Sequence, residues 1–165
     1  MPQQLLISDA NILIDMDVGG LIDAMFALEY EFTTPNILYE QELAQYHPYL
    51  LAKGLRLMEL APESIDRASE LERQYNGVSS YDLAALSLAE QVTAPLLSGD
   101  RKLRQVCLEE DIEVHGTIWL VEQILIAGTA SVSEIEVAYN RMEEDGSRLP
   151  WDEVDKQLKQ FRKKK

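Results

Sequence analysis

Short apolar segments alternate with segments of helical periodicity along most of this chain, and this alternation limits the fold more than any other feature. The expected strands are residues 4–8, 30–33, 54–60, 95–98 and 112–115. Between them, apolar residues recur at helical spacing. Strands that are separated by helices pair in parallel through right-handed crossovers. The sequence therefore predicts an α/β fold, in which a central parallel sheet of order 3-2-1-4-5 carries helices on both faces.

Four acidic residues stand where strands end or helices begin. Asp9 follows the first apolar run and Asp100 follows the fourth, whereas Asp82 lies at the head of a helix and Glu40 lies on the helix that Pro35 opens. The carboxyl ends of parallel strands meet in one crevice, so we expect these carboxylates to converge there. Clustered carboxylates need a cation to stay ionised together, and oxygen ligands suit Mg²⁺ and Mn²⁺. The sequence therefore predicts a divalent-metal site suited to phosphodiester hydrolysis.

The segments around these acids resemble the motifs of the PIN-domain nucleases, in the order and spacing of that family. They are Asp9-Ala10-Asn11, Pro35-Asn36-Ile37-Leu38-Tyr39-Glu40, Asp82-Leu83-Ala84-Ala85 and Leu96-Leu97-Ser98-Gly99-Asp100. The resemblance implies a PIN-like three-layer fold. It also implies a ribonuclease that depends on Mg²⁺ or Mn²⁺ and hydrolyses single-stranded RNA. The best-known relatives are toxins of toxin–antitoxin pairs, so an antitoxin protein is an expected partner.

The C-terminal part of the chain extends beyond the compact toxin pattern. We expect a PIN-like nuclease domain at residues 1–130 and a helical extension at residues 131–165 that packs on the same domain. Ser131-Val132-Ser133-Glu134 has the pattern of a capping box that opens a helix. In the last expected helix, Val154, Leu158 and Phe161 form one apolar stripe, which must pack on the rest of the domain or across a homodimer contact.

The resemblance implies a role for each acid. Asp9, Asp82 and Asp100 are the expected metal ligands, and Glu40 completes the catalytic set. Glu42 lies two residues further along, on a different face of the same helix, and a small shift of that helix would exchange the two glutamates.

Two polar residues are expected beside the metal ligands, and the acidic residues have three alternative interpretations. Asn11 and Ser98 are expected to orient the metal ligands through hydrogen bonds or to satisfy backbone groups at strand ends. Taken singly, the three aspartates also suit helix N-termini, where Asp and capping boxes are common. A haloacid-dehalogenase-type phosphatase would need a second Asp at the position of Asn11. A non-catalytic binding module on the same fold is the remaining alternative.

The charge distribution bears on the partners. The net charge of −14 disfavours a nucleic-acid partner at first sight, because phosphate binding is normally driven by Lys and Arg. Much of the positive charge, however, lies beside Asp100 and in the C-terminal tail. Arg101, Lys102 and Arg104 are therefore the expected contacts of the RNA. The rest of the chain is strongly acidic, which favours a basic protein partner.

The sequence also favours a cytoplasmic protein with no membrane association. Its longest apolar runs are too short to span a bilayer, and the first expected strand begins directly after Met1-Pro2 without a leader pattern. The lone Cys107 has no partner for an internal disulfide and is expected to be a small buried apolar side chain.

Overall fold

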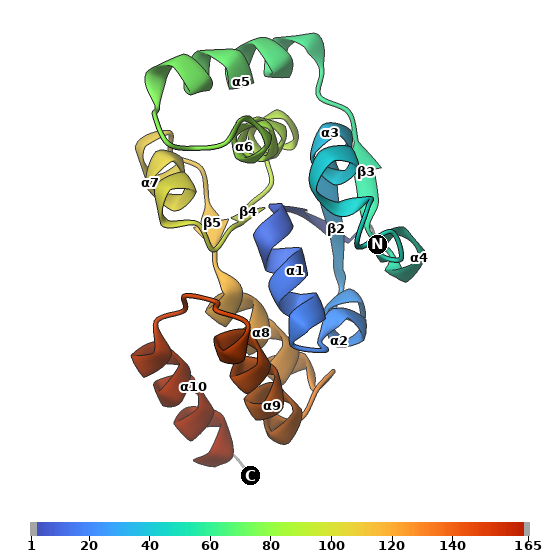
Figure 1. Ribbon diagram of the computed structural model, residues 1–165, viewed down its shortest axis with the longest axis vertical. Coiled ribbons are helices and arrows are strands. Elements are labelled where there is room, and N and C mark those ends of the chain that lie inside the picture. Colours follow the sequence, from blue (N-terminus) through green and yellow to red (C-terminus); the bar gives the residue numbers. More distant parts are fainter. Residues whose placement is uncertain (1–2, 164–165) are drawn as a thin grey trace.

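The computed structural model describes residues 3–163 as an α/β fold around five parallel strands (Figure 1). The strands are β1 (Gln4–Ser8), β2 (Tyr30–Pro35), β3 (Arg56–Met58), β4 (Leu96–Leu97) and β5 (Val114–His115). Their order is β3-β2-β1-β4-β5 and every pairing is parallel, so the predicted fold class and strand order are confirmed. The order changes direction between β1 and β4, and ligands of open α/β sheets bind at such a point.

Helices cover the sheet in further layers. Before β5 they are α1 (Ala10–Val18), α2 (Ile22–Phe26), α3 (Asn36–Leu38), the π-helical turn η1 (Tyr39–Leu43), α4 (Leu50–Lys53), α5 (Pro62–Gln74), α6 (Ser80–Val92) and α7 (Arg101–Glu109). Helix α6 packs on β1, β2 and β4, and α5 lies on the outer side of α6 (Figure 1). Because it is covered on two sides, α6 is buried at every position from Asp82 to Ala89. A hydrogen bond of 2.6 Å from Ser87 Oγ to the Ser64 carbonyl ties these two helices together.

The C-terminal helices pack on the same core as the sheet. They are α8 (Thr117–Ala127), α9 (Val132–Glu144) and α10 (Trp151–Lys163); α9 contacts α1, and α10 contacts both α8 and α9. Val154 and Leu158 of α10 are buried in one core cluster with the strand residues, as the apolar stripe predicts. Gln157 joins the three helices, because it accepts from the Tyr139 hydroxyl (2.6 Å) and donates to the Ile118 carbonyl (2.9 Å).

The two last lysines of the chain, Lys164 and Lys165, lie outside the described residues. Within residues 3–163, every helix is too short or too polar to cross a bilayer.

The ends of the helices show why particular polar residues stand where they do. Asp9 caps α1 by accepting from the Ile12 amide (3.0 Å), and Asp100 caps α7 by accepting from the Lys102 amide (2.9 Å). Ser131 and Glu134 form the predicted capping box at the start of α9. These side chains satisfy amides that lack a partner inside their own helix.

The helix expected after Pro35 contains an irregular turn. The amide of Ala44 donates to the carbonyl of Tyr39 (2.8 Å), five residues back, which defines the π turn η1. A π turn holds one residue more than an α turn, so it rotates the residues that follow it relative to a regular helix. Glu40 and Glu42 therefore point in other directions than they would in a regular α-helix of the same sequence.

Candidate metal centre

Asp9 is the most buried acid of the candidate site. It follows β1 at the centre of the sheet, and its side chain is fully inaccessible to solvent. Oδ1 accepts the capping hydrogen bond from Ile12, whereas Oδ2 is buried without a hydrogen-bond partner among the described residues. Burial raises the pKa of Asp9 to about 7, although the Ile12 amide and the Ser98 hydroxyl act in the opposite direction. A buried acceptor with no donor is costly, which makes Oδ2 a position where a cation or a proton would be stabilised.

Asp82 lies in the first turn of α6 and is almost completely buried. Its own amide donates to Ser79 Oγ (3.1 Å), so Ser79 caps this helix and the carboxylate of Asp82 is not needed for that cap. Burial, together with the negative charges of Glu42 and Asp100, raises the pKa of Asp82 to about 6. These two neighbours come from η1 and from the start of α7, so the structure brings acids from three segments together.

Asp100 and Ser98 follow β4, directly beside the end of β1. The Asp100 carboxylate lies close enough to Asp82 for its negative charge to raise the pKa of the Asp82 carboxyl. Ser98 is fully buried, accepts from the Asp100 amide (3.1 Å) through its hydroxyl and lowers the pKa of Asp9. Ser98 therefore connects the loop that carries Asp100 to the Asp9 carboxylate.

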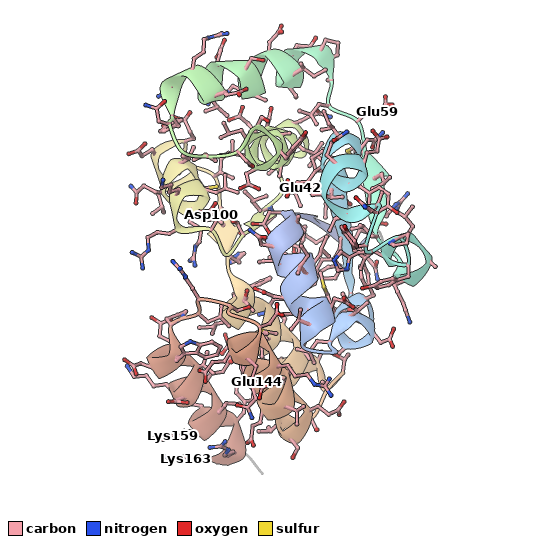
Figure 2. The ribbon with its side chains drawn as sticks, in the orientation of Figure 1. Glu42, Glu59, Asp100, Glu144, Lys159 and Lys163 are labelled. Carbon is pink, nitrogen blue, oxygen red and sulfur yellow. The ribbon has the colours of Figure 1, made fainter. Side chains whose placement is uncertain are left out.

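The two glutamates of η1 point to different surroundings. Glu42 lies close enough to Asp82 to raise its pKa, and partial burial raises the pKa of Glu42 itself. Glu40 instead lines a groove between α3, α5 and α6, together with Glu59 and Tyr81. Figure 2 shows Glu42 and Asp100 on either side of the start of α1. The charge contacts thus associate Glu42, and not Glu40, with the aspartates.

The other predicted polar site residues of α1 and α7 are exposed to solvent. Asn11 is exposed in the first turn of α1, and Arg101, Lys102 and Arg104 are exposed on α7. Lys102 extends over Gly77 in the loop before α6, and Arg104 extends over Gly116 at the end of β5. The roles of these four residues stay predictions.

The basic residues at the C-terminal end are distant from this cluster. Figure 2 shows Lys159 and Lys163 at the far end of α10 from Asp100.

The donor chemistry of the cluster fits a hard divalent cation. No group of three or more His, Cys, Asp or Glu side chains within residues 3–163 is already gathered closely enough to hold a metal. The acids nevertheless present only oxygen donors, one of them without a partner, and they raise one another's pKa. A divalent cation would remove that repulsion, and Mg²⁺ or Mn²⁺ accepts carboxylate oxygens while keeping several waters.

One protein family matches the sequence over nearly its whole length. A family model described as a PIN domain matches residues 5–163. The chain therefore belongs to the PIN-domain family, and the predicted resemblance is confirmed. The family is of the nuclease type; its members generally act on RNA and typically use divalent metals. No curated protein matches the chain. The division of the chain at residue 130 stays a prediction, since the family match continues through α10.

Sequence reasoning overlooked two features near the cluster. The first is the π turn, for which the segment 39–43 offers no signal beyond the closely spaced pair of glutamates. The second is Thr117, a buried residue at the start of α8 whose Oγ1 has no hydrogen-bond partner among residues 3–163. A Thr directly after a Gly at the end of a strand is unremarkable in a sequence, so only the packed structure reveals its burial.

Proposed function

We propose that this chain is a divalent-metal-dependent ribonuclease that hydrolyses single-stranded RNA. Asp9, Asp82 and Asp100 hold Mg²⁺ or Mn²⁺, and Glu42 takes the place of Glu40 as the fourth acid. The observation that carries the proposal is the fully buried Asp9, whose unpartnered Oδ2 lies within a cluster of carboxylates with raised pKa values. Burying several carboxylates together is unfavourable unless a cation is bound, so the cluster points to a ligand.

Each residue of the proposed site has its own role in hydrolysis. When bound, the metal supplies charge neutralisation at the phosphoryl group and an activated water. Asp9 is fixed by its place at the end of β1 and by Ile12, while Ser98 holds the Asp100 loop against it. Glu42, the more exposed acid, orients the water and receives its proton. Because the 2′-hydroxyl takes no part, the products should carry 5′-phosphate and 3′-hydroxyl ends.

The test is cleavage of a labelled single-stranded RNA with Mn²⁺, with Mg²⁺ and with EDTA. Cleavage should need the metal and should be lost in Asp82→Asn, whereas Asp66→Asn, an exposed acid of α5, should behave as the unmodified protein. A separate readout is stability, because a ligand present at a hundred times its Kd raises the free energy of unfolding by about 2.7 kcal/mol. Cleavage that persists in EDTA would contradict the metal mechanism, as would a thermal midpoint that does not change when Mn²⁺ is added.

An inhibitory protein partner and a homodimer belong to the same proposal. The groove beside Glu40 is bordered by Glu59 and Glu72, and Ile37 and Ile65 are exposed in its wall, which suits a basic partner with apolar side chains such as an antitoxin. Leu57 of the edge strand β3 is exposed, as is Tyr46 between η1 and α4, and exposed apolar side chains of this kind suit a contact between two copies of the chain. Light scattering of the purified chain, alone and with a co-expressed neighbouring gene product, would decide both points.

A further inference from the structure

A cavity of about 320 Å³ lies beside the carboxylate cluster, where β5 leads into α8. Its wall comes from five segments: the loop after β4, helix α7, strand β5, the first turns of α8, and the connection from α9 into α10 with the start of α10. Gly99, which lines it, stands between Ser98 and Asp100 in the chain. The cavity is therefore adjacent to the candidate metal centre but uses different side chains.

The floor of the cavity is a helix N-terminus without a side-chain cap. Gly116 is the N-cap of α8 and provides no side chain, and the residues 117–119 that line the cavity carry the first amides of the helix. Such amides have no partner within their own helix and form the positive end of its dipole. This end of α8 is consequently suited to an anion.

Arg104 reaches the same helix end, although its charge has the same sign. A Cβ atom at Gly116 would lie only 3.0 Å from Nη1 of Arg104, so the absence of a side chain there allows the guanidinium to approach α8. A cation beside a helix N-terminus is unfavourable by itself. An anion between the guanidinium and the first amides of α8 would make both groups favourable partners.

Thr117 provides an independent sign of a ligand. Its side chain is 2% exposed and lines the cavity, yet Oγ1 has no hydrogen-bond partner among residues 3–163. A buried hydroxyl without a partner costs free energy unless a ligand or an ordered water completes it. A hydroxyl can donate to an oxyanion, as can the amides beside it.

The remaining charges of the wall are balanced. Arg148, from the connection between α9 and α10, adds a second guanidinium, and Glu122 and Glu153 add two carboxylates. Within residues 3–163, neither Arg104 nor Arg148 forms an ion pair with a carboxylate, so both guanidinium groups are available to a ligand. With the side-chain charges balanced, the field that favours an anion is that of the helix end.

We propose that this cavity is a phosphate subsite, which holds a backbone phosphate of a nucleic-acid strand next to the carboxylate cluster. The first amides of α8, the Thr117 hydroxyl and the guanidinium groups of Arg104 and Arg148 are its donors. The choice of a strand phosphate rests on the proposed nuclease function, whereas the anion chemistry does not. Because Arg148 lies in the C-terminal part of the chain, the subsite also gives that part a role in substrate binding.

The test is strand binding without metal or cleavage. Anisotropy of a dye-labelled single-stranded oligoribonucleotide would be measured in EDTA over a range of salt concentrations. Arg148→Ala should weaken binding about tenfold and lower the salt slope by about 0.7, the value for one phosphate contact on a single strand. Arg73→Ala, which removes an exposed arginine of α5 outside this cavity, should change neither value.

Thr117 separates a binding role from a structural one. Thr117→Val keeps the shape of the side chain but removes the hydroxyl, so it should weaken strand binding several-fold while the thermal midpoint stays the same or rises. Thr117→Ser should restore binding. If Thr117→Val and Arg148→Ala both bind the strand like the unmodified protein, the subsite is refuted.

Inorganic orthophosphate serves as a second probe, since it carries the same anion without a strand. If orthophosphate raises the thermal midpoint in a manner that depends on Arg148, but strand affinity does not depend on it, the cavity binds free phosphate and the strand assignment is overturned. Failure of the nuclease function would look different: the strand would bind in EDTA as described, and no cleavage would follow on addition of Mn²⁺.

Discussion

At the scale of single residues, Asp9 combines a structural and a chemical role in one carboxylate. Oδ1 caps α1, which normally stabilises a helix by about 1 kcal/mol, while Oδ2 is buried without a partner. Asp9 can therefore be a helix cap and a metal ligand at the same time, because its two carboxylate oxygens have different surroundings. The sequence identified the residue through the end of β1, but the division of labour between its oxygens depends on packing around β4.

Asp9 should make the stability of the metal-free protein depend on pH. Its pKa is raised from 3.8 to about 7 in the folded state, so the folded form binds the proton more tightly than the unfolded form. This contribution is fully present below pH 3.8 and is lost as the pH rises through about 7. Denaturant unfolding in EDTA should show that Asp9→Asn, which keeps a capping side chain, loses less stability across this window than the unmodified protein. Equal losses in both proteins would show that Asp9 is ionised throughout.

The two glutamates of η1 give a second prediction at this scale. Glu42→Gln removes a negative charge beside Asp82, so it should lower the pKa of Asp82. It also removes the proposed proton acceptor, so it should reduce the rate of RNA cleavage about 100- to 10,000-fold. Glu40→Gln, two residues away in the groove, should leave the rate unchanged. Comparing the two cleavage rates at saturating Mn²⁺ decides the assignment, and the reverse result would return the fourth acid to Glu40.

At the scale of elements, the sequence predicted what depends on local pattern and missed what depends on packing. The period of the apolar residues predicted the five strands and their order, and Ser131 with Glu134 predicted a cap that the structure contains. The helix after Pro35 was predicted without its π turn, because a π turn is stabilised by the burial of Tyr39 and Leu43 and not by a local residue preference. The positions of the three aspartates after strand ends or at a helix start could be predicted from the sequence, whereas the surroundings of Glu40 and Glu42 depend on the π turn.

Two helix caps test which elements support the site. Ser79→Ala removes the cap of α6 and Ser131→Ala removes the cap of α9, and each should lower the free energy of unfolding by about 1 kcal/mol. Only Ser79 lies beside an acid of the cluster, so only its loss should weaken Mn²⁺ binding measured by calorimetry. If Ser131→Ala weakened Mn²⁺ binding equally, the effect would reflect general destabilisation of the fold.

At the scale of the whole molecule, the C-terminal helices share the core of the sheet. Buried side chains of α9 and α10, such as Ile135, Met142 and Val154, belong to one cluster with Ile7 of β1. Ser147 also donates to the Asp15 carboxylate of α1 (2.8 Å), so polar contacts join the same parts. The apolar stripe predicted that α10 packs on the helices after Gly116, and its contacts with α8 and α9 confirm this.

The last prediction concerns the removal of α10 by truncation after Leu149. The truncated chain would expose the side of α8 and α9 that Leu158 covers, and it would leave the Tyr139 hydroxyl and the Ile118 carbonyl without Gln157. Leu158→Ala alone should lower the free energy of unfolding by about 2 to 4 kcal/mol, and the truncation by more. Lys159→Ala, on the exposed side of the same helix, should stay within about 0.5 kcal/mol of the unmodified protein in the same denaturant titration. A truncated chain with undiminished stability would show that the strand-containing part folds independently of α10.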